Sequence, residues 1–410
     1  IKTAAAKANK TLNLLDAKRS NAIIRASKEV LSGKHDDQFP IDIFQTGSGT
    51  STNMNANEVI ARLASKFSGV DVDPNDHVNM SQSSNDVIPT AINLSTHCGM
   101  EHHLLPALDN LINIIDEKAK KVEGTTKTGR THLMDAMPLD MSQELMAWSS
   151  QLRASQKSLT TVTDQLLALP QGGTAVGTGI NAHPRFSIEF AKEVSRIEKI
   201  KAKPSDNFFH SLSSQDTSLQ LSGEMRNLAT VLMKISNDLR WMNSGPLSGL
   251  GEIELQALQP GSSIMPGKVN PVIPEAVTMV CAEVIGSDTT VAIAAQSGNF
   301  QLNVMLPVIA YNLLKSLNIL SNAMGILGNK AIKTFKVNKT TIQESLERNP
   351  VLVTALSPII GYAKAAEIAK KAYKGRRSVI EVALEETKLS RKRLEKLLNP
   401  ENLTTGGIKK

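Results

Sequence analysis

The chain has 410 residues, of which 41% are hydrophobic and only 3% aromatic, so a large core has to be built mainly from aliphatic side chains. Its formal net charge is +7, and residues 361–410 carry 13 basic and 6 acidic residues, so the excess charge lies in this last segment and the rest of the chain is neutral. A basic end on a neutral body, with few aromatics to stack on bases, argues against a nucleic-acid partner.

Cysteine content and hydropathy indicate the cellular compartment and bear on metal and membrane binding. Cys98 and Cys281 are the only cysteines, which predicts a reducing, cytoplasmic location and gives no support for a metal site. The sequence contains no uninterrupted run of roughly 18 apolar residues. We therefore expect no membrane-spanning segment and no membrane partner.

Apolar residues recur at helical spacing in five long stretches, whereas alternating strand patterns are almost absent. This predicts an all-α fold built on a bundle of long helices. Several stripes are too long for one small core, which favours self-association. The stripes comprise Leu104, Leu108, Leu111 and Ile115; Leu145, Trp148, Leu152, Leu159, Val162 and Leu166; Leu228, Val231, Leu232, Ile235 and Leu239; Ala276, Val277, Val280, Cys281, Val284 and Ile285; and residues 313–327.

Turn-rich segments divide this pattern into three expected regions. Residues 1–80 form an N-terminal helical domain, residues 81–345 the central long-helix bundle, and residues 346–410 a small C-terminal helical domain that carries the excess charge. Pro106 is expected to kink or interrupt the first long helix.

Four polar clusters interrupt the helical pattern, and we expect each to stand where a helix begins or ends. Hydroxyl and amide side chains at a helix N-terminus are usually caps, but one cap per helix does not account for several in succession. Converging donors at helix N-termini form anion sites that suit small carboxylates. The clusters span residues 45–58, with Ser48 and Thr50; residues 81–86, with Ser83, Ser84 and Asn85; residues 129–135, with Thr131 and His132; and residues 261–271, with Ser262, Lys268 and Asn270.

The fourth cluster has the composition of a mobile loop that holds a carboxylate. Its glycines and prolines allow close backbone approach to a ligand, and Lys268 and Asn270 supply a cation and an amide donor two residues apart. The alternative is a surface loop rich in glycine and proline whose lysine has no function. Glu275 follows early in the next helix, and a carboxylate of this kind is suited to orient an imidazole such as that of His132.

A glycine-rich segment at residues 172–179 is a possible phosphate or dinucleotide loop. The strand that such a loop needs before it is missing, because residues 152–169 are expected to be helical and end at Pro170. We therefore predict a helix–loop junction near the substrate rather than a cofactor site.

Taken together, the four clusters resemble those of the fumarase/aspartase superfamily, and most closely the class II fumarases, from Ala4 to about Glu386. The segment at 261–271 matches the superfamily signature residue for residue. The resemblance implies an all-α, three-region fold whose central helices form the core of a homotetramer, with each active site shared between three subunits. It implies reversible hydration of fumarate to (S)-malate through an aci-carboxylate intermediate, with no metal and no organic cofactor.

The resemblance also assigns roles to individual residues. Ser262 would be the base that takes the C3 proton, and His132, backed by Glu275, would handle the proton of the hydroxyl or water. Lys268 would stabilise the charge that develops on the carboxylate. The substrate carboxylates would be bound by Ser48, Thr50, Ser83, Ser84, Asn85, Thr131, Lys268 and Asn270.

Two alternatives to fumarate hydratase remain. Aspartate ammonia-lyases share the 261–271 signature, but fumarases tend to carry Ser-Ser-Asn, as at 83–85, and Gln-Thr-Gly-Ser-Gly-Thr, as at 45–50. A structural protein recruited from this fold would have lost catalytic residues that are present here. One departure concerns a second dicarboxylate site of bacterial fumarases, because Asp73 stands where their His-Pro-Asn-Asp pattern begins with histidine.

Overall fold

The computed structural model describes residues 1–408, which divide into two compact units. Unit 1 comprises residues 1–107, 155–230 and 280–322, and unit 2 comprises residues 108–154, 231–279 and 323 onward. Each long helix that crosses a boundary contributes one segment to each unit. The two units are described separately.

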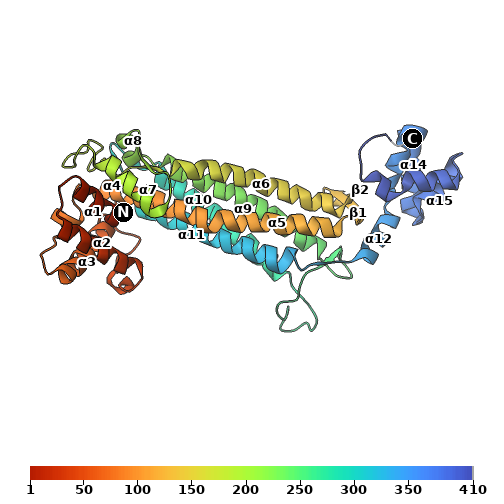
Figure 1. The fold of residues 1–410 in the computed structure, drawn as a ribbon. Helices are drawn as coiled ribbons and strands as arrows, with labels where there is room; N and C mark the ends of the chain where they lie inside the picture. The colour runs from red at the N-terminus through yellow and green to blue at the C-terminus, as the bar shows by residue number, and fades with distance from the viewer. Residues whose placement is uncertain (409–410) are drawn as a thin grey trace. The chain divides into compact units, whose positions relative to one another are not determined.

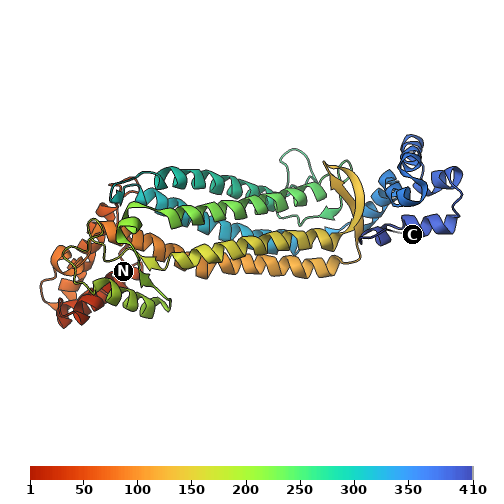
Figure 2. The same cartoon turned by 90° about the horizontal axis from the view of Figure 1, so that it is seen from above.

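Five long helices carry the apolar stripes. They are α5 (Leu105–Val122), α6 (Met141–Gln165), α9 (Asp216–Met242), α10 (Val272–Ala295) and α11 (Leu306–Ile326). Within each unit their segments run side by side in both views (Figures 1 and 2). The stripe residues Leu108, Trp148 and Leu232 are fully buried. The predicted helical bundle and mostly helical fold are therefore confirmed.

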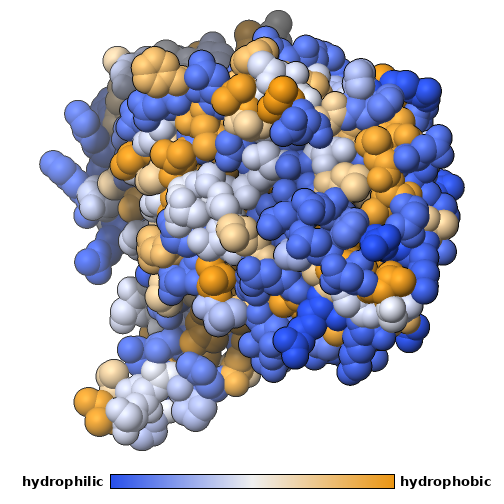
Figure 3. Space-filling view, turned by 90° about the vertical axis from the view of Figure 1, so that its left-hand side faces the viewer, coloured by the Kyte–Doolittle hydropathy of each residue, from blue (hydrophilic) through white to orange (hydrophobic). Residues whose placement is uncertain are grey.

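Unit 1 holds the N-terminal helices, which are α1 (Lys2–Thr11), α2 (Ala17–Leu31), α3 (Thr50–Ser68), α4 (Ser84–Gly99), α7 (Phe186–Glu198) and α8 (Phe208–Ser213). Ile23 and Ile60 belong to a small core between α2 and α3. A second core places alanines of α1 against Phe186 and Phe190 of α7. The face in Figure 3, at the end that carries α1 to α3, is mostly hydrophilic with smaller hydrophobic areas.

Unit 2 holds an antiparallel hairpin of β1 (Thr126–Thr131) and β2 (Met134–Asp140). Its C-terminal helices are α12 (Lys339–Arg348), α13 (Ser357–Ile360), α14 (Tyr362–Gly375), α15 (Val379–Glu386) and α16 (Arg391–Leu398). Leu356, Ile368 and Leu394 are fully buried in a core that residues 352–356 share with α14, α15 and α16.

Short elements complete the chain. The π-helical and 3₁₀ turns are η1 (Asp36–Gln38), η2 (Pro74–Val78), η3 (Met100–Leu104), η4 (Leu327–Ile332), η5 (Pro350–Leu356) and η6 (Pro400–Leu403). The two-residue strands are β3 (Ala168–Leu169) with β4 (Lys203–Pro204), β5 (Ile253–Glu254) with β8 (Lys336–Val337), and β6 (Gly298–Asn299) with β7 (Leu302–Asn303). The expected interruption near Pro106 is the π-helix η3 between α4 and α5.

The structure corrects two local predictions. The cluster at 129–135 does not mark a helix end, because Thr131 and His132 lie at the tip of the β1–β2 hairpin. The helical stretch before the glycine-rich segment ends at Gln165 rather than Leu169, and the two-residue strand β3 follows it. Periodicity missed both because these strands are short and pair locally. The division into three regions stays a prediction.

Among residues 1–408, only helix α10 is long and apolar enough by composition to cross a membrane. One third of its apolar 18-residue window is buried inside the structure. It also carries Glu275, Glu283 and Asp288. The core helix of a globular protein passes the same test, so the finding is weak support for a membrane span.

Candidate active site

The loop at 261–271 leads directly into α10 and is closed on itself by short contacts. The hydroxyl oxygen of Ser262 accepts hydrogen bonds from the backbone N–H groups of Ile264, at 3.2 Å, and Met265, at 3.0 Å. The side-chain amide of Asn270 donates to the carbonyl of Gly261 at 2.6 Å. A Cβ at Gly261 would lie 1.9 Å from the carbonyl oxygen of Lys268, so this closed shape requires glycine there.

The two donors to Ser262 matter chemically. A serine hydroxyl is a poor base, because its conjugate alkoxide is unstable in neutral water. Backbone N–H groups that point at the oxygen favour its anionic form. Ser262 is half-buried, so its environment combines partial exclusion of water with two fixed donors.

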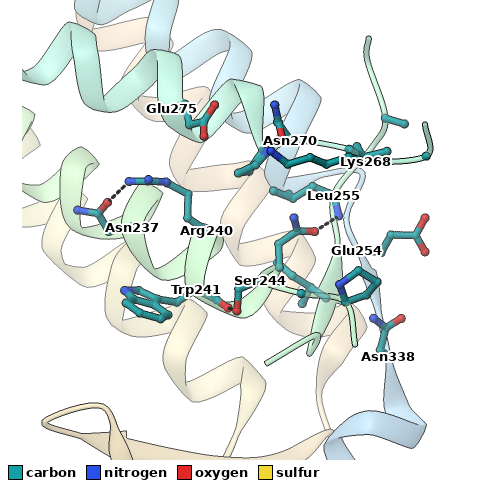
Figure 4. A pocket seen from close by; sticks show the side chains of 18 residues that line it. Asn237, Arg240, Trp241, Ser244, Glu254, Leu255, Lys268, Asn270, Glu275 and Asn338 are labelled. Atoms are coloured by element: carbon teal, nitrogen blue, oxygen red, sulfur yellow. Dashed lines mark hydrogen bonds between the residues drawn. The ribbon is translucent and has the colours of Figure 1, made fainter. Parts of the chain in front are cut away.

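Unit 2 contains a cavity of about 690 Å³ beside this loop. Lys268 and Asn270 reach it from the loop, and Glu275 reaches it from the first turns of α10 (Figure 4). The structure thus brings three of the predicted residues together. Ser262 is not part of the cavity lining.

Sequence reasoning missed Arg240, which lines the same cavity from the end of α9. Its guanidinium donates to the side-chain oxygen of Asn237 at 3.0 Å (Figure 4). A cation in the last turn of a helix is ordinarily explained by the helix dipole. The feature of the sequence that could have identified Arg240 is its position directly after the apolar stripe at 228–239, where the helix pattern ends.

His132 and Leu133 form the two-residue turn of the β1–β2 hairpin, and both have positive φ, 56° and 60°. Such a turn suits asparagine and glycine, whereas a bulky residue in this region is strained. The turn places the imidazole on an exposed tip, next to the exposed Thr131. Within the described part of unit 2, no hydrogen bond or ion pair joins His132 to Glu275, so the expected pairing is not made within one chain.

In unit 1, the first cluster begins α3. The hydroxyls of Ser48 and Thr50 lie 2.7 Å apart across the left-handed N-cap residue Gly49. Ser48 is buried and Thr50 is half-buried. The prediction that this cluster marks a helix start is confirmed.

The second cluster begins α4. The Ser83 hydroxyl caps the helix by accepting from the backbone N–H of Asn85 at 3.2 Å. The side-chain amide of Asn53 donates to the hydroxyl of Ser84 at 3.0 Å, and that of Asn85 donates to the carbonyl of Ala175 at 2.8 Å. Each of the three residues therefore holds a defined position at a helix N-terminus.

Sequence reasoning also missed Lys2, whose ammonium is buried and donates to Asn79 and Gln82 at 3.0 Å each. Burial lowers the pKa of Lys2 to about 7, against the opposing effect of the nearby Asp86. Asn79 also accepts from Asn53, so a buried network leads from Lys2 to the partner of Ser84.

The side chain of Asp73 binds the backbone N–H groups of the residues that follow it. Its carboxylate accepts from the N–H groups of Asn75, at 2.7 Å, and Asp76, at 2.8 Å. The hydrogen bond from Asp76 and then that from Asn75 lower the pKa of Asp73. An internal carboxylate thus fills the position that an external anion would take at these N–H groups.

The predicted residues fall into two sets. Ser48, Thr50, Ser83, Ser84 and Asn85 lie in unit 1, and Thr131, His132, Ser262, Lys268, Asn270 and Glu275 lie in unit 2. Within residues 1–408, no group of three or more His, Cys, Asp or Glu side chains is arranged to hold a metal ion.

Comparison with known proteins gives matches that span both groups of predicted site residues. The family described as Lyase matches residues 1–286, and the family described as Fumarase C C-terminus matches residues 352–405. The chain is similar to a class II fumarate hydratase of Pseudomonas aeruginosa, with 58% identity over 99% of this chain and 89% of the relative. It is also similar to the class II fumarate hydratase of Bacillus subtilis, with 46% identity over 98% of this chain and 88% of the relative.

A solved structure extends the likeness to the fold. The crystal structure of class II fumarase from Schistosoma mansoni superposes with a TM-score of 0.96 at 39% identity, covering 98% of this chain and 88% of that one.

Proposed function

The chain belongs to the lyase family that contains the class II fumarate hydratases, and from this we propose that it is a fumarate hydratase, a hydro-lyase that interconverts fumarate and (S)-malate. The observation that carries the proposal is the loop at 261–271, where the Ser262 hydroxyl accepts two backbone N–H groups beside a cavity that holds Lys268. Identity of 58% to a class II fumarate hydratase over 99% of this chain supports the same activity.

The chemistry requires a base for a very weak acid. Dehydration of malate removes a C3 proton next to a carboxylate, which must accept a second negative charge as an aci-carboxylate. Ser262 takes the proton, because Ile264 and Met265 stabilise its oxyanion. Lys268 and Asn270 hold the carboxylate on which the charge develops.

Departure of the hydroxyl needs a general acid. We assign this role to His132, which the hairpin turn presents on an exposed tip. Addition of water to fumarate runs the same steps in reverse, with His132 taking the proton from water and Ser262 returning the proton to C3. The two groups act from opposite faces of the substrate, which makes the elimination anti.

We propose a homotetramer whose active sites draw residues from three subunits. Large apolar side chains are exposed on the long helices, including Met279 and Ile293 of α10 and Tyr311 of α11, and association would cover them. His132 makes no hydrogen bond or ion pair with Glu275 within the described chain, so a partner copy would complete the pair. Light scattering tests the assembly by giving four times the chain mass of 44.2 kDa.

Mixing inactive variants tests the shared sites. Ser262→Ala and His132→Asn chains, each inactive alone, are expected to recover part of the activity after co-refolding, because some mixed sites receive both intact residues. Lack of recovery in a tetramer that has demonstrably mixed would show that each site belongs to one chain.

The free thiols of Cys98 and Cys281 support our proposal that the enzyme works in a reducing compartment, the cytoplasm.

The function is tested by absorbance near the ultraviolet edge on mixing purified protein with L-malate and, separately, with L-aspartate. Fumarate formed from malate alone supports the hydratase. Fumarate formed from aspartate alone would move the activity to aspartate ammonia-lyase, and no fumarate from either would overturn the proposal.

A further inference from the structure

Asp86, in the first turn of α4, is a fully buried carboxylate that joins two segments of unit 1 distant in sequence. One oxygen accepts from the backbone N–H of Ser83 at 3.0 Å, within its own helix turn. The other accepts from the backbone N–H groups of Gly172, at 3.0 Å, and Thr174, at 2.9 Å. Three main-chain donors therefore converge on one side chain with no exposed surface.

These contacts link the second polar cluster to the glycine-rich segment. Asp86 directly follows Ser83, Ser84 and Asn85, and the amide of Asn85 reaches the same segment through the carbonyl of Ala175 at 2.8 Å. The segment is thus hydrogen-bonded to α4 at three positions, 172, 174 and 175. No phosphate or dinucleotide is needed to account for the glycines.

Close packing explains the glycine composition instead. Gly172 has a φ of +111°, and a Cβ there would lie 2.6 Å from the Cβ of Ser187. A Cβ at Gly173 would lie 2.9 Å from that of Phe208. Residues 172–175 are therefore packed between α4 on one side and residues 187 and 208 on the other. A displacement of either neighbour is expected to move this segment.

We propose that Asp86 is a positioning residue for substrate binding: it holds residues 172–175 against the N-terminus of α4, and this clamp sets the positions of Ser84 and Asn85 for a substrate carboxylate. The inference rests on the proposed function only in naming the dicarboxylate. Burial raises the pKa of Asp86 to about 6, and the three N–H donors oppose that rise, so near neutral pH the clamp is an ionised acceptor. Charge-assisted hydrogen bonds of this kind are about twice as strong as neutral ones.

Asp86→Asn tests the clamp with little change in volume. The amide keeps one acceptor oxygen and turns two hydrogens toward main-chain donors, so one side of the clamp has to open. Because Ser84 and Asn85 bind substrate and transition state alike, we expect KM for fumarate to rise roughly ten- to hundredfold with a smaller loss in kcat. Backbone amide exchange in residues 171–179 is expected to accelerate.

Asp288→Asn is the matched control. Asp288 is also a buried carboxylate of unit 1, but its partners are the side chains of Ser222 and Arg226. Its replacement is expected to cost stability while leaving KM and exchange in residues 171–179 unchanged. If Asp86→Asn lowers the melting temperature but keeps the wild-type KM, or if Asp288→Asn raises KM equally, Asp86 is merely structural and the proposal fails.

Gly172→Ala covers the case in which Asp86→Asn does not fold. It leaves the carboxylate intact and pushes the segment from the side of Ser187, so the same rise in KM is expected. A wild-type KM in a folded Gly172→Ala protein would contradict the clamp.

Equilibrium binding of succinate separates this inference from the function. Succinate has two carboxylates and no double bond, so its affinity does not depend on turnover. Absence of malate formation by the wild type would reject the hydratase. Weaker succinate binding by Asp86→Asn than by Asp288→Asn would still support the clamp, and equal binding would reject it.

Discussion

The ammonium nitrogen of Lys127 lies 2.7 Å from a carboxylate oxygen of Glu252, and the two side chains are only 3% and 2% exposed. Lys127 also pairs with Glu144 at 2.8 Å, and Arg130 reaches the other oxygen of Glu252 at 2.7 Å. Lys127 and Arg130 belong to β1, whose hairpin carries His132. Glu252 directly precedes Ile253, which lines the cavity of unit 2. The ion pairs therefore fix the hairpin to one wall of that cavity.

Replacement of Glu252 by glutamine should be strongly destabilising, because it leaves the buried charge of Lys127 with Glu144 alone. Removal of one partner of a buried pair typically costs about 3–5 kcal/mol. Glu117→Gln, at an exposed position of α5, should stay within about 0.5 kcal/mol of wild type. Chemical unfolding measures both, and equal stabilities would show that the cluster contributes little.

Ser262→Ala should lower kcat by orders of magnitude, because it removes the proposed base and leaves the two N–H donors of the loop in place. The overall fold should be retained, since the Ser262 hydroxyl makes its hydrogen bonds within its own loop, to the N–H groups of Ile264 and Met265. Circular dichroism and light scattering check the fold and the assembly. Turnover close to that of wild type would reject Ser262 as the base.

Lys268→Ala should raise KM and lower kcat together, because in the proposed function the ammonium binds a carboxylate that is charged in the substrate and more highly charged in the aci-carboxylate. The exposed Lys330 of η4 offers a control for the loss of one positive charge. If Lys330→Ala and Lys268→Ala have the same small effect, the cavity lysine has no carboxylate role.

The parts of the molecule that follow from local pattern were predictable. Stripes such as Leu108–Leu111 and Leu228–Leu232 lie on one face of a helix, so spacing alone identified the buried side. The starts of α3, α4 and α10 followed from polar residues ahead of apolar periodicity. The hairpin that carries His132 could not be predicted in this way, because the two turn residues have positive φ but are not of the types that usually indicate such a turn.

The contacts that organise the candidate site were harder to foresee. Lys127 with Glu252, and Asp86 with Gly172, are separated by more than 80 residues. A lone buried charge has no periodic signature, and its partner is chosen by the tertiary fold. Arg240 is exposed and was missed for a different reason, since only the folded chain places it in the lining of the same cavity as Lys268.

One class of dicarboxylate site per chain is expected, because the Asp73 carboxylate already occupies the N–H groups of Asn75 and Asp76. Titration calorimetry with succinate should give one site per chain. In Asp73→Ala those donors are freed, and a second, weaker anion site should appear. Two classes of site in the wild type would contradict this assignment.

Asp86 should also give a pH dependence of stability with a defined sign. Burial, its largest effect, raises the pKa of Asp86 to about 6 from 3.8, so the folded protein holds this proton more tightly than the unfolded chain. The corresponding stability is fully present below about pH 3.8 and is lost as the pH rises through 6. Lys2 is the charged group that acts on Asp86 in this region, and its own pKa of about 7 keeps it protonated over most of the range.

Comparison of wild type with Asp86→Asn isolates this effect, since asparagine does not titrate. The stability of wild type relative to the variant should fall by roughly 2–3 kcal/mol between pH 4 and pH 7, because each pKa unit corresponds to about 1.4 kcal/mol. Asp16→Asn provides a control of opposite sign, because hydrogen bonds from Arg19 lower the pKa of Asp16 and its contribution is lost as the pH falls. Urea unfolding at several pH values measures both differences. A wild-type advantage over Asp86→Asn that grows with pH would show that the N–H donors outweigh burial and that the carboxylate is more acidic than an exposed one.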